Sequence, residues 1–255
     1  MTGEHTARER CGETPSANGR AAHRSVAASD YVFAMPGSLL TRALIVAAVV
    51  AIGASIAGLT TVHYVAKPLA TACCVAIALA ARPPVSARYR LGIAAGLILG
   101  LAGDVWLMIP GPGHFAVGLG AFLAGHLAYL VALTDGARFF SRPRPVTWFA
   151  VVGVAMSAAL LPNVEPSLRV AVTVYAVVLC TMAAQARVRA LVVGSPGARL
   201  AATGAALFVV SDAALSLDRF VAPVPWSTVA ILSTYWMAQW ALATSVRAIA
   251  VAEAG

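Results

Sequence analysis

The sequence has little charge for its length. Only 11% of the 255 residues are Asp, Glu, Lys or Arg, whereas 60% are hydrophobic and the mean hydropathy is +0.83. Soluble domains carry about 25% charged residues, which they need to cover a surface that faces water. The composition therefore excludes an ordinary soluble domain and predicts a protein that crosses a membrane several times.

The sequence also lacks cysteines at ligand-like spacings. Its four cysteines are Cys11, Cys73, Cys74 and Cys180, and none belongs to a C-x-x-C or similar motif. Zinc and dithiol redox sites depend on such spacings. We expect the three cysteines in apolar stretches to be buried packing residues.

No stretch combines basic and aromatic residues in the way that a nucleic-acid-binding groove does. The formal net charge is +8, but the basic residues occur mostly singly or in threes between apolar segments. Membrane topology produces this distribution, because basic residues gather in the loops on one side. We therefore expect no nucleic-acid partner.

No hydrophobic run precedes Leu39, so a cleavable signal peptide is not predicted. Residues 1–37 are polar, have no sustained hydrophobic period and predict a disordered cytoplasmic tail. Residues 38–252 are expected to form a single transmembrane catalytic domain.

Eight apolar segments follow the tail, and each is long enough or nearly so to cross about 30 Å of hydrocarbon. Helices satisfy their own backbone hydrogen bonds in lipid, so the segments predict an all-α, polytopic membrane protein. Pro and Gly residues separate most of the segments. The predicted spans are residues 39–60, 67–82, 91–109, 113–133, 146–161, 169–190, 198–217 and 226–250.

Basic residues alternate between the predicted loops and so indicate the orientation. The set on the opposite side from the termini contains only Lys67, Arg169 and Arg219. By the positive-inside rule both termini are cytoplasmic, and the protein is expected in the inner (plasma) membrane. The basic set on the predicted cytoplasmic side is Arg24, Arg42, Arg82, Arg88, Arg90, Arg138, Arg142, Arg144, Arg187, Arg189, Arg199 and Arg247.

Two acidic residues lie inside predicted spans, whereas all the others lie in loops or tails. They are Asp104, in LGIAAGLILGLAGDVWLM, and Asp212, in LAATGAALFVVSDAALSL. A carboxylate in such a segment costs roughly 2.5 to 3.5 kcal/mol on insertion scales and is typical of a functional site. Each acid is predicted about five residues inside the outer end of its helix, so we expect a pair at one depth. The alternatives are a structural ion pair with Lys67 or Arg219, or a proton relay.

A short internal similarity accompanies the two acids. Gly103-Asp104 with a later Phe115 resembles Ser211-Asp212 with a later Phe220, four predicted helices further on. This spacing predicts a parallel duplication of four helices plus four, with both acids beside a pseudo-two-fold axis.

Other polar residues in the spans are candidates for binding. His126 and Tyr129 follow a stripe of Gly and Phe on the fourth span, and Tyr235 and Gln239 lie one turn apart on the eighth. Interhelical hydrogen bonding is the alternative for each, because donors in lipid need partners. We expect His126, deeper than the acids, to make a supporting hydrogen bond. Lys67, before Pro68 at the predicted start of the second span, is either an interfacial anchor or a phosphate contact.

Together these residues resemble the YhhN-like lysoplasmalogenase family over about residues 40–250. Each motif is short, but the five occur in order on the appropriate helices. The matching features are Lys67-Pro68, Gly103-Asp104, the F-x-x-G-x-x-x-F-x-x-x-H-x-x-Y series from Phe115 to Tyr129, Gly204-x-x-x-Phe208-x-x-Ser211-Asp212, and Tyr235-x-x-x-Gln239.

The resemblance implies an ether hydrolase that acts on a lysophospholipid within the membrane. It would cleave the vinyl ether bond of a lysoplasmalogen with water and release a fatty aldehyde and a glycerophospho-base. The expected catalytic residues are Asp104 and Asp212, and the reaction requires neither a metal nor an organic cofactor. The expected substrate-binding residues are Lys67, His126, Tyr129, Ser211, Tyr235 and Gln239.

The chemistry suits two carboxyl groups in one site. A vinyl ether hydrolyses through protonation of its outer carbon, which gives an oxocarbenium ion that water captures. Two adjacent carboxyl groups of low solvation do not both ionise easily, so one is expected to donate the proton while the other stabilises the cation. The sequence does not determine which Asp has which role, nor the head group, the chain length or the oligomeric state.

Two other functions remain open at this point. His63 and His114 could join the two acids in a zinc site, as in a metal-dependent membrane lipid hydrolase. Alternatively, Asp104, Asp212 and His126 could form the relay of a proton-coupled transporter or lipid flippase.

Overall fold

The described part of the structure, a computed structural model, comprises residues 39–111 and 113–248. These residues form helices joined by short loops, without a β-strand in these two ranges, so the predicted all-α fold is confirmed. The predicted tail, residues 1–37, lies outside the described residues.

Eight long helices make up this part of the chain. Seven are long and apolar enough to cross a membrane: Leu39–Ile56, α2 (Thr60–Ala80), α3 (Ala87–Met108), α4 (His114–Leu133), the continuous stretch Pro143–Asn163, α6 (Pro166–Val193) and α7 (Pro196–Phe220). The stretch Pro143–Asn163 comprises α5 (Pro143–Leu160) and a short 3₁₀ helix, η1 (Leu161–Asn163). The eighth, α8 (Ser227–Thr244), is less apolar than these seven, and its Tyr235 and Gln239 side chains are buried in the interior.

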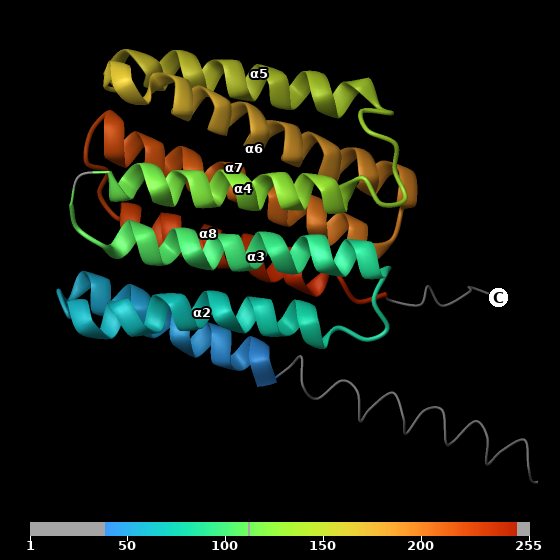
Figure 1. Ribbon diagram of the computed structural model, residues 1–255, viewed down its shortest axis with the longest axis horizontal. Helices are drawn as coiled ribbons and strands as arrows, with labels where there is room; N and C mark the ends of the chain where they lie inside the picture. Colours follow the sequence, from blue (N-terminus) through green and yellow to red (C-terminus); the bar gives the residue numbers. More distant parts are fainter. Residues whose placement is uncertain (1–38, 112, 249–255) are drawn as a thin grey trace, which may run out of the picture. The chain divides into compact units, whose positions relative to one another are not determined.

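The helices lie side by side in one bundle (Figure 1). Helix α3 packs mainly against α2 and α4, and α7 packs against α6 and α8. Helix α8 also contacts α2 and α3, so it closes the bundle around a common interior. Helix α5 lies at the edge and contacts mainly α6, which leaves most of its residues on the surface.

The helix starts follow from local chemistry. Pro occupies the first turn of α5, α6 and α7, where its missing N–H removes no hydrogen bond. The hydroxyl of Ser86 accepts a hydrogen bond from the backbone N–H of Tyr89 at the start of α3, and Ser195 accepts one from Ala198 at the start of α7. These caps determine where the two helices that carry the acids begin.

The predicted start of the second span is wrong. Helix α2 begins at Thr60, so Lys67-Pro68 lies in the third turn rather than at the first. Gly58, with a φ of 71°, reverses the chain just before α2, and the Nδ1 atom of His63 lies 2.9 Å from the carbonyl oxygen of Ala51. Pro68 is tolerated inside the helix because the surrounding helices hold this segment in place.

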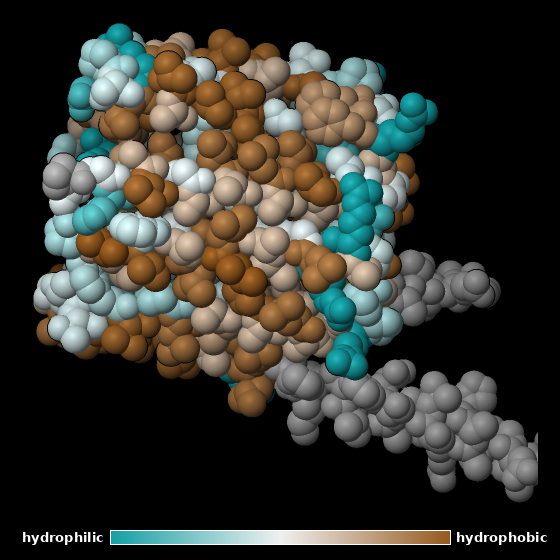
Figure 2. All heavy atoms as spheres, in the orientation of Figure 1, coloured by the Kyte–Doolittle hydropathy of each residue, from teal (hydrophilic) through white to brown (hydrophobic). Residues whose placement is uncertain are grey.

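The surface has the distribution expected of a membrane-spanning bundle. Hydrophobic residues cover the middle of the face shown in Figure 2, and hydrophilic residues gather towards its two ends. Large apolar side chains such as Trp148, Val154 and Val170 are exposed on the outside of the bundle. Such side chains are stable against lipid, so the chain forms a multi-pass membrane protein. The internal repeat stays a prediction.

Candidate functional site

A cavity of about 530 Å³ lies at one end of the bundle, the end of the α3–α4 and α7–α8 connections. Helices α2, α3, α7 and α8, with Ser55 of the first span, supply its polar lining, and α4 supplies two Phe side chains. The lining includes Lys67, Asp104, Ser211, Asp212, Arg219 and Tyr235. Both intramembrane acids therefore face the same space, although they are far apart in the sequence.

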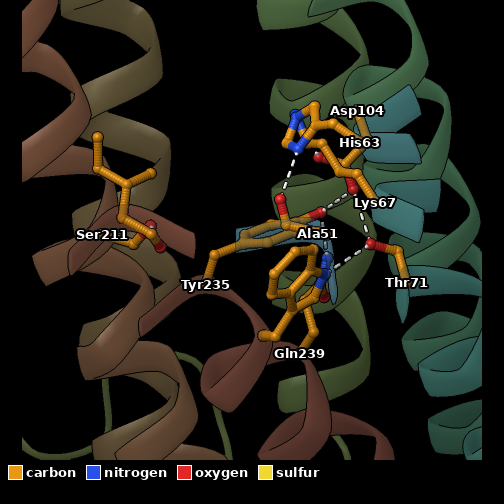
Figure 3. Close-up of polar contacts among 10 residues, drawn as sticks. Ala51, His63, Lys67, Thr71, Asp104, Ser211, Tyr235 and Gln239 are labelled. Carbon is orange, nitrogen blue, oxygen red and sulfur yellow. Dashed lines mark hydrogen bonds and ion pairs between the residues drawn. The ribbon is translucent and has the colours of Figure 1, made fainter. Parts of the chain in front are cut away.

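Asp104 has three polar partners, two on α2 and one on α8 (Figure 3). Its Oδ1 atom lies 3.3 Å from the Nζ atom of Lys67. Its Oδ2 atom accepts hydrogen bonds from the hydroxyls of Thr71 and Tyr235, each at 2.7 Å. The side chain is almost fully buried, so these partners replace the water that a charged carboxylate would otherwise require.

A second set of hydrogen bonds holds these partners in place. The indole N–H of Trp236 donates to Thr71 at 3.2 Å. The amide of Gln239 donates to the hydroxyl of Tyr235 at 2.9 Å and accepts from the hydroxyl of Tyr129 at 2.6 Å. Tyr129 on α4 is thus linked through α8 to Asp104 on α3, which restricts the rotation of all three helices.

Asp212 has a different environment. Its Oδ2 atom accepts a hydrogen bond of 2.5 Å from the hydroxyl of Tyr175 on α6. Among residues 39–111 and 113–248 it forms no ion pair, because the ion pair in these ranges joins Lys67 and Asp104. The two acids therefore share a cavity but differ in the charge beside them.

Glycines allow the helices of the site to approach closely. A Cβ atom at Gly103 would lie 2.6 Å from the ring of Phe122, and one at Gly100 would lie 2.8 Å from Nε2 of Gln239. Real Cβ atoms essentially never show such distances, so a larger residue at either point would displace the Phe122 ring or the Gln239 amide. This packing places Phe122 directly against the residue that precedes Asp104.

The predicted site residues occupy two distinct regions. Lys67, Ser211 and Tyr235 line the cavity with the two acids. Tyr129 and Gln239 do not line it; they are buried behind Tyr235 and support it by hydrogen bonds. The hydroxyl of Ser211 donates to the backbone carbonyl of Ile231 at 3.1 Å, which ties α7 to α8.

His126 does not reach the cavity. Its ring is fully buried, and its centroid lies 4.7 Å from that of Phe208 and 5.2 Å from that of Tyr175. Neither ring nitrogen has a hydrogen-bond partner among the described residues, so the expected supporting hydrogen bond is not found. The rings of Phe208 on α7, Tyr175 on α6 and Tyr129 on α4 instead pack around it.

Lys67 departs from its predicted setting as well. Its ammonium lies against Asp104 inside the bundle, with a side-chain exposure of 11%, and not at the interface. The reason is the earlier start of α2, which places Lys67 two turns deeper in the bundle than expected. The structural ion pair that the sequence left open is therefore formed with Lys67, while Arg219 remains outside it.

Three contributors to the site were not among the catalytic and substrate-binding residues predicted from the sequence. Thr71 follows Lys67 by four residues, so helical spacing could have placed it on the same face of α2. Tyr175 lies on α6, and no sequence pattern links it to Asp212. Arg219 falls just beyond the predicted end of its span, but α7 continues to Phe220 and carries it to the cavity.

The two alternative functions receive no support from this geometry. Among the described residues, no three of the His, Cys, Asp and Glu side chains are grouped as metal ligands would be. The Nδ1 atoms of His63 and His114 instead lie within hydrogen-bond distance of the backbone carbonyls of Ala51 and Pro110. A relay through His126 lacks a hydrogen bond from its ring to either acid.

The fold and the site define a class: a polytopic helical membrane protein with two buried carboxyl groups in one cavity at an end of its bundle. The sequence comparisons then identify the family. The chain belongs to the YhhN family, which it matches over residues 62–246, and the resemblance seen in the sequence motifs is confirmed.

The chain is also similar to several curated proteins. The chain is similar to "Lysoplasmalogenase TMEM86A" of Bos taurus, with 34% identity over 59% of this chain and 62% of the relative. It is similar to "Lysoplasmalogenase TMEM86B" of Sus scrofa, with 32% identity over 62% and 64% of the two chains. It is also similar to "Lysoplasmalogenase" of Mycobacterium tuberculosis (strain CDC 1551 / Oshkosh), with 33% identity over 55% and 57%. The matched part thus spans about three fifths of each relative, and no solved structure matches the chain significantly.

Proposed function

We propose that this protein hydrolyses the vinyl ether bond of lysoplasmalogens to a fatty aldehyde and a glycerophospho-base. The observation that carries the proposal is the placement of Asp104 and Asp212 around one cavity in a member of the YhhN family. Relatives named as lysoplasmalogenases support the substrate class. The substrate would be a lysophospholipid in the membrane, and water would be the second reactant.

The reaction needs a proton donor beside a fixed negative charge. The donor protonates the outer vinyl carbon, and the carbon attached to oxygen becomes part of an oxocarbenium ion. A nearby anion lowers the energy of that cation, most strongly where water is scarce. A general acid and a separate carboxylate within one cavity meet both requirements.

Asp104 suits the role of the charged carboxylate. The ammonium of Lys67 at 3.3 Å balances its charge, and the hydroxyls of Thr71 and Tyr235 both donate to it. A buried carboxylate with a cation and two donors has the partners that the ionised form requires. We therefore assign Asp104 the stabilisation of the oxocarbenium ion and the acceptance of a proton from the attacking water.

Asp212 suits the role of the proton donor. It is 7% exposed, faces the same cavity and has no cationic partner among the described residues. The Tyr175 hydroxyl donates to Oδ2, which leaves Oδ1 as the atom that can carry a proton towards the substrate. A carboxyl group of low solvation with no cation beside it has the environment of a general acid.

The proposed steps balance without a further reactant. Asp212 gives its proton to the outer carbon, and the vinyl π electrons form the new C–H bond. Water adds to the oxocarbenium carbon and loses a proton to the carboxylate of Asp104. The hemiacetal then separates into aldehyde and alcohol, and proton exchange through the cavity water returns both carboxyl groups to their starting states.

The localisation is part of the same proposal. Basic residues gather at the bundle end opposite to the cavity, as in Arg88, Arg138, Arg142 and Arg199. The positive-inside rule then places that end and both termini in the cytoplasm, with the cavity at the outer side of the plasma membrane.

The decisive experiment compares three substitutions that leave the shape of the side chain nearly unchanged. Asp104→Asn and Asp212→Asn should each lower aldehyde release from a lysoplasmalogen by a factor of about 10² or more, because each removes a proton-transfer group. Glu165→Gln is the control, because Glu165 is an exposed acid outside the cavity and should retain the wild-type rate. Size-exclusion profiles in detergent verify folding, and full turnover in either Asn variant contradicts the paired mechanism.

A further inference from the structure

The basic residues at the outer end of the bundle differ in their interaction partners. Three basic residues were assigned to this side by the sequence, and two of them are engaged or remote. Lys67 pairs with Asp104, and Arg169 donates its Nε to the backbone carbonyl of Val164 at 3.0 Å and does not line the cavity. Arg219 lines the cavity and has no acidic partner among the described residues.

The position of Arg219 is fixed by an aromatic ring rather than by a carboxylate. Its Cζ atom lies 5.0 Å from the centroid of Phe115, and Phe115 lines the same cavity. The neighbouring Asp218 does not pair with Arg219; its Oδ1 accepts a hydrogen bond from the backbone N–H of Val224 at 2.9 Å. A guanidinium over a ring face still presents its N–H groups at the ring edge, where an anion can bind.

Arg219 also has a defined relation to the proposed proton donor. Asp212 and Arg219 are seven residues apart on α7, so they lie on one face of the helix at a rise of about 10.5 Å. Both residues line the main cavity, and both line a smaller, mainly apolar pocket of about 50 Å³ that Tyr175 and Phe122 also line. In an extended lysoplasmalogen, the glycerol backbone and the ether oxygen separate the phosphate from the vinyl carbons by a comparable length.

We infer that Arg219 binds the phosphodiester of the substrate and thereby sets the vinyl ether beside Asp212, an inference that rests on the proposed function. Arginine is suited to this role because its planar guanidinium can donate two parallel hydrogen bonds to one phosphate. Lys67, which the sequence suggested for the phosphate, is instead the counter-ion of Asp104. The head group is thus recognised at the cavity mouth, and the chemistry takes place two helical turns deeper.

The test measures binding separately from turnover. The probes are a 1-alkyl lysophospholipid, which lacks the vinyl group and is not hydrolysed, and a 1-alkylglycerol with the same chain but no phosphate. The proteins are the wild type, Arg219→Gln, Arg219→Lys and the control Arg169→Gln, each solubilised in detergent. Loss of a charge-assisted contact should weaken phospholipid binding to Arg219→Gln by about tenfold or more.

The expected pattern is specific to phosphate recognition. Arg219→Gln should bind the alkylglycerol as the wild type does. Arg219→Lys should retain part of the wild-type affinity for the phospholipid, and the control Arg169→Gln should retain all of it. With a lysoplasmalogen, Arg219→Gln should raise KM about tenfold and change kcat much less. Unchanged phospholipid binding in Arg219→Gln, or an equal loss for both probes, overturns the inference. Absence of aldehyde release from the wild type contradicts the proposed function, whereas the binding comparison still decides the role of Arg219.

Discussion

At the scale of single residues, the two intramembrane acids are both aspartates, but they have different partners. Asp104 has an ammonium and two hydroxyl donors, whereas Asp212 has one phenol hydroxyl. This asymmetry provides a physical reason for assigning different roles to two residues of the same type. It also makes Lys67 a part of the electrostatics of the site.

The ion pair of Lys67 and Asp104 allows a prediction about stability. Lys67→Met leaves Asp104 buried without its cation and should lower the free energy of unfolding by about 3 to 5 kcal/mol. The double variant Lys67→Met with Asp104→Asn removes the unpaired charge and should recover much of that loss. Thermal denaturation in detergent measures both, and Arg169→Met serves as an exposed control. Equal losses in the single and double variants would show that the pair contributes no electrostatic coupling.

At the scale of helices, close packing at glycine decides where the site residues meet. Helices α7 and α8 carry Asp212 and Tyr235, and the hydroxyl of Ser211 bonds to the backbone of α8. A Cβ atom at Gly204 would lie 2.9 Å from the carbonyl oxygen of Ala238, which is backbone and cannot turn aside. The close approach of α7 and α8 at this point depends on the glycine.

The contact at Gly204 predicts a difference between two chemically identical substitutions. Gly204→Ala should destabilise the protein by about 1 to 3 kcal/mol, because the methyl group overpacks the α7–α8 interface. Gly53→Ala is the matched control, because a Cβ atom at Gly53 has no neighbour within 4 Å. The two melting temperatures in detergent provide the comparison. A melting temperature of Gly204→Ala equal to that of the control would contradict the close packing.

At the scale of the whole molecule, the cavity lies at one end of the helices and the excess of basic residues lies at the other. A lysophospholipid in the outer leaflet has its head group at the membrane surface and its chain in the hydrocarbon. A cavity near the surface with its acids one or two turns inside suits this proposed substrate better than a site at the bilayer centre. The orientation of the bundle therefore bears directly on which leaflet supplies the substrate.

Cysteine labelling tests this orientation. Ser167→Cys introduces a thiol in an exposed position at the start of α6, on the cavity side, and Ser141→Cys introduces one in the loop before α5. An impermeant thiol reagent added to intact cells should label Ser167→Cys alone, and permeabilised cells should show labelling of both. Both variants are made in a Cys11→Ser background, whose remaining cysteines, Cys73, Cys74 and Cys180, are buried. Labelling of Ser141→Cys in intact cells would reverse the proposed topology.

The sequence by itself determined the all-α fold, the succession of apolar segments, the family and the two acids as exceptional residues. These features depend on composition and on spacing along the chain, which the linear order of residues contains. Tertiary structure alone decided that Lys67 and Thr71 meet Asp104, that Tyr175 meets Asp212, and that Arg219 reaches the cavity. Those contacts join different helices, and their formation depends on where each helix begins and how it is rotated. Packing at glycines and hydrogen bonds across the bundle set both quantities, and neither can be read from the periodicity of a single segment.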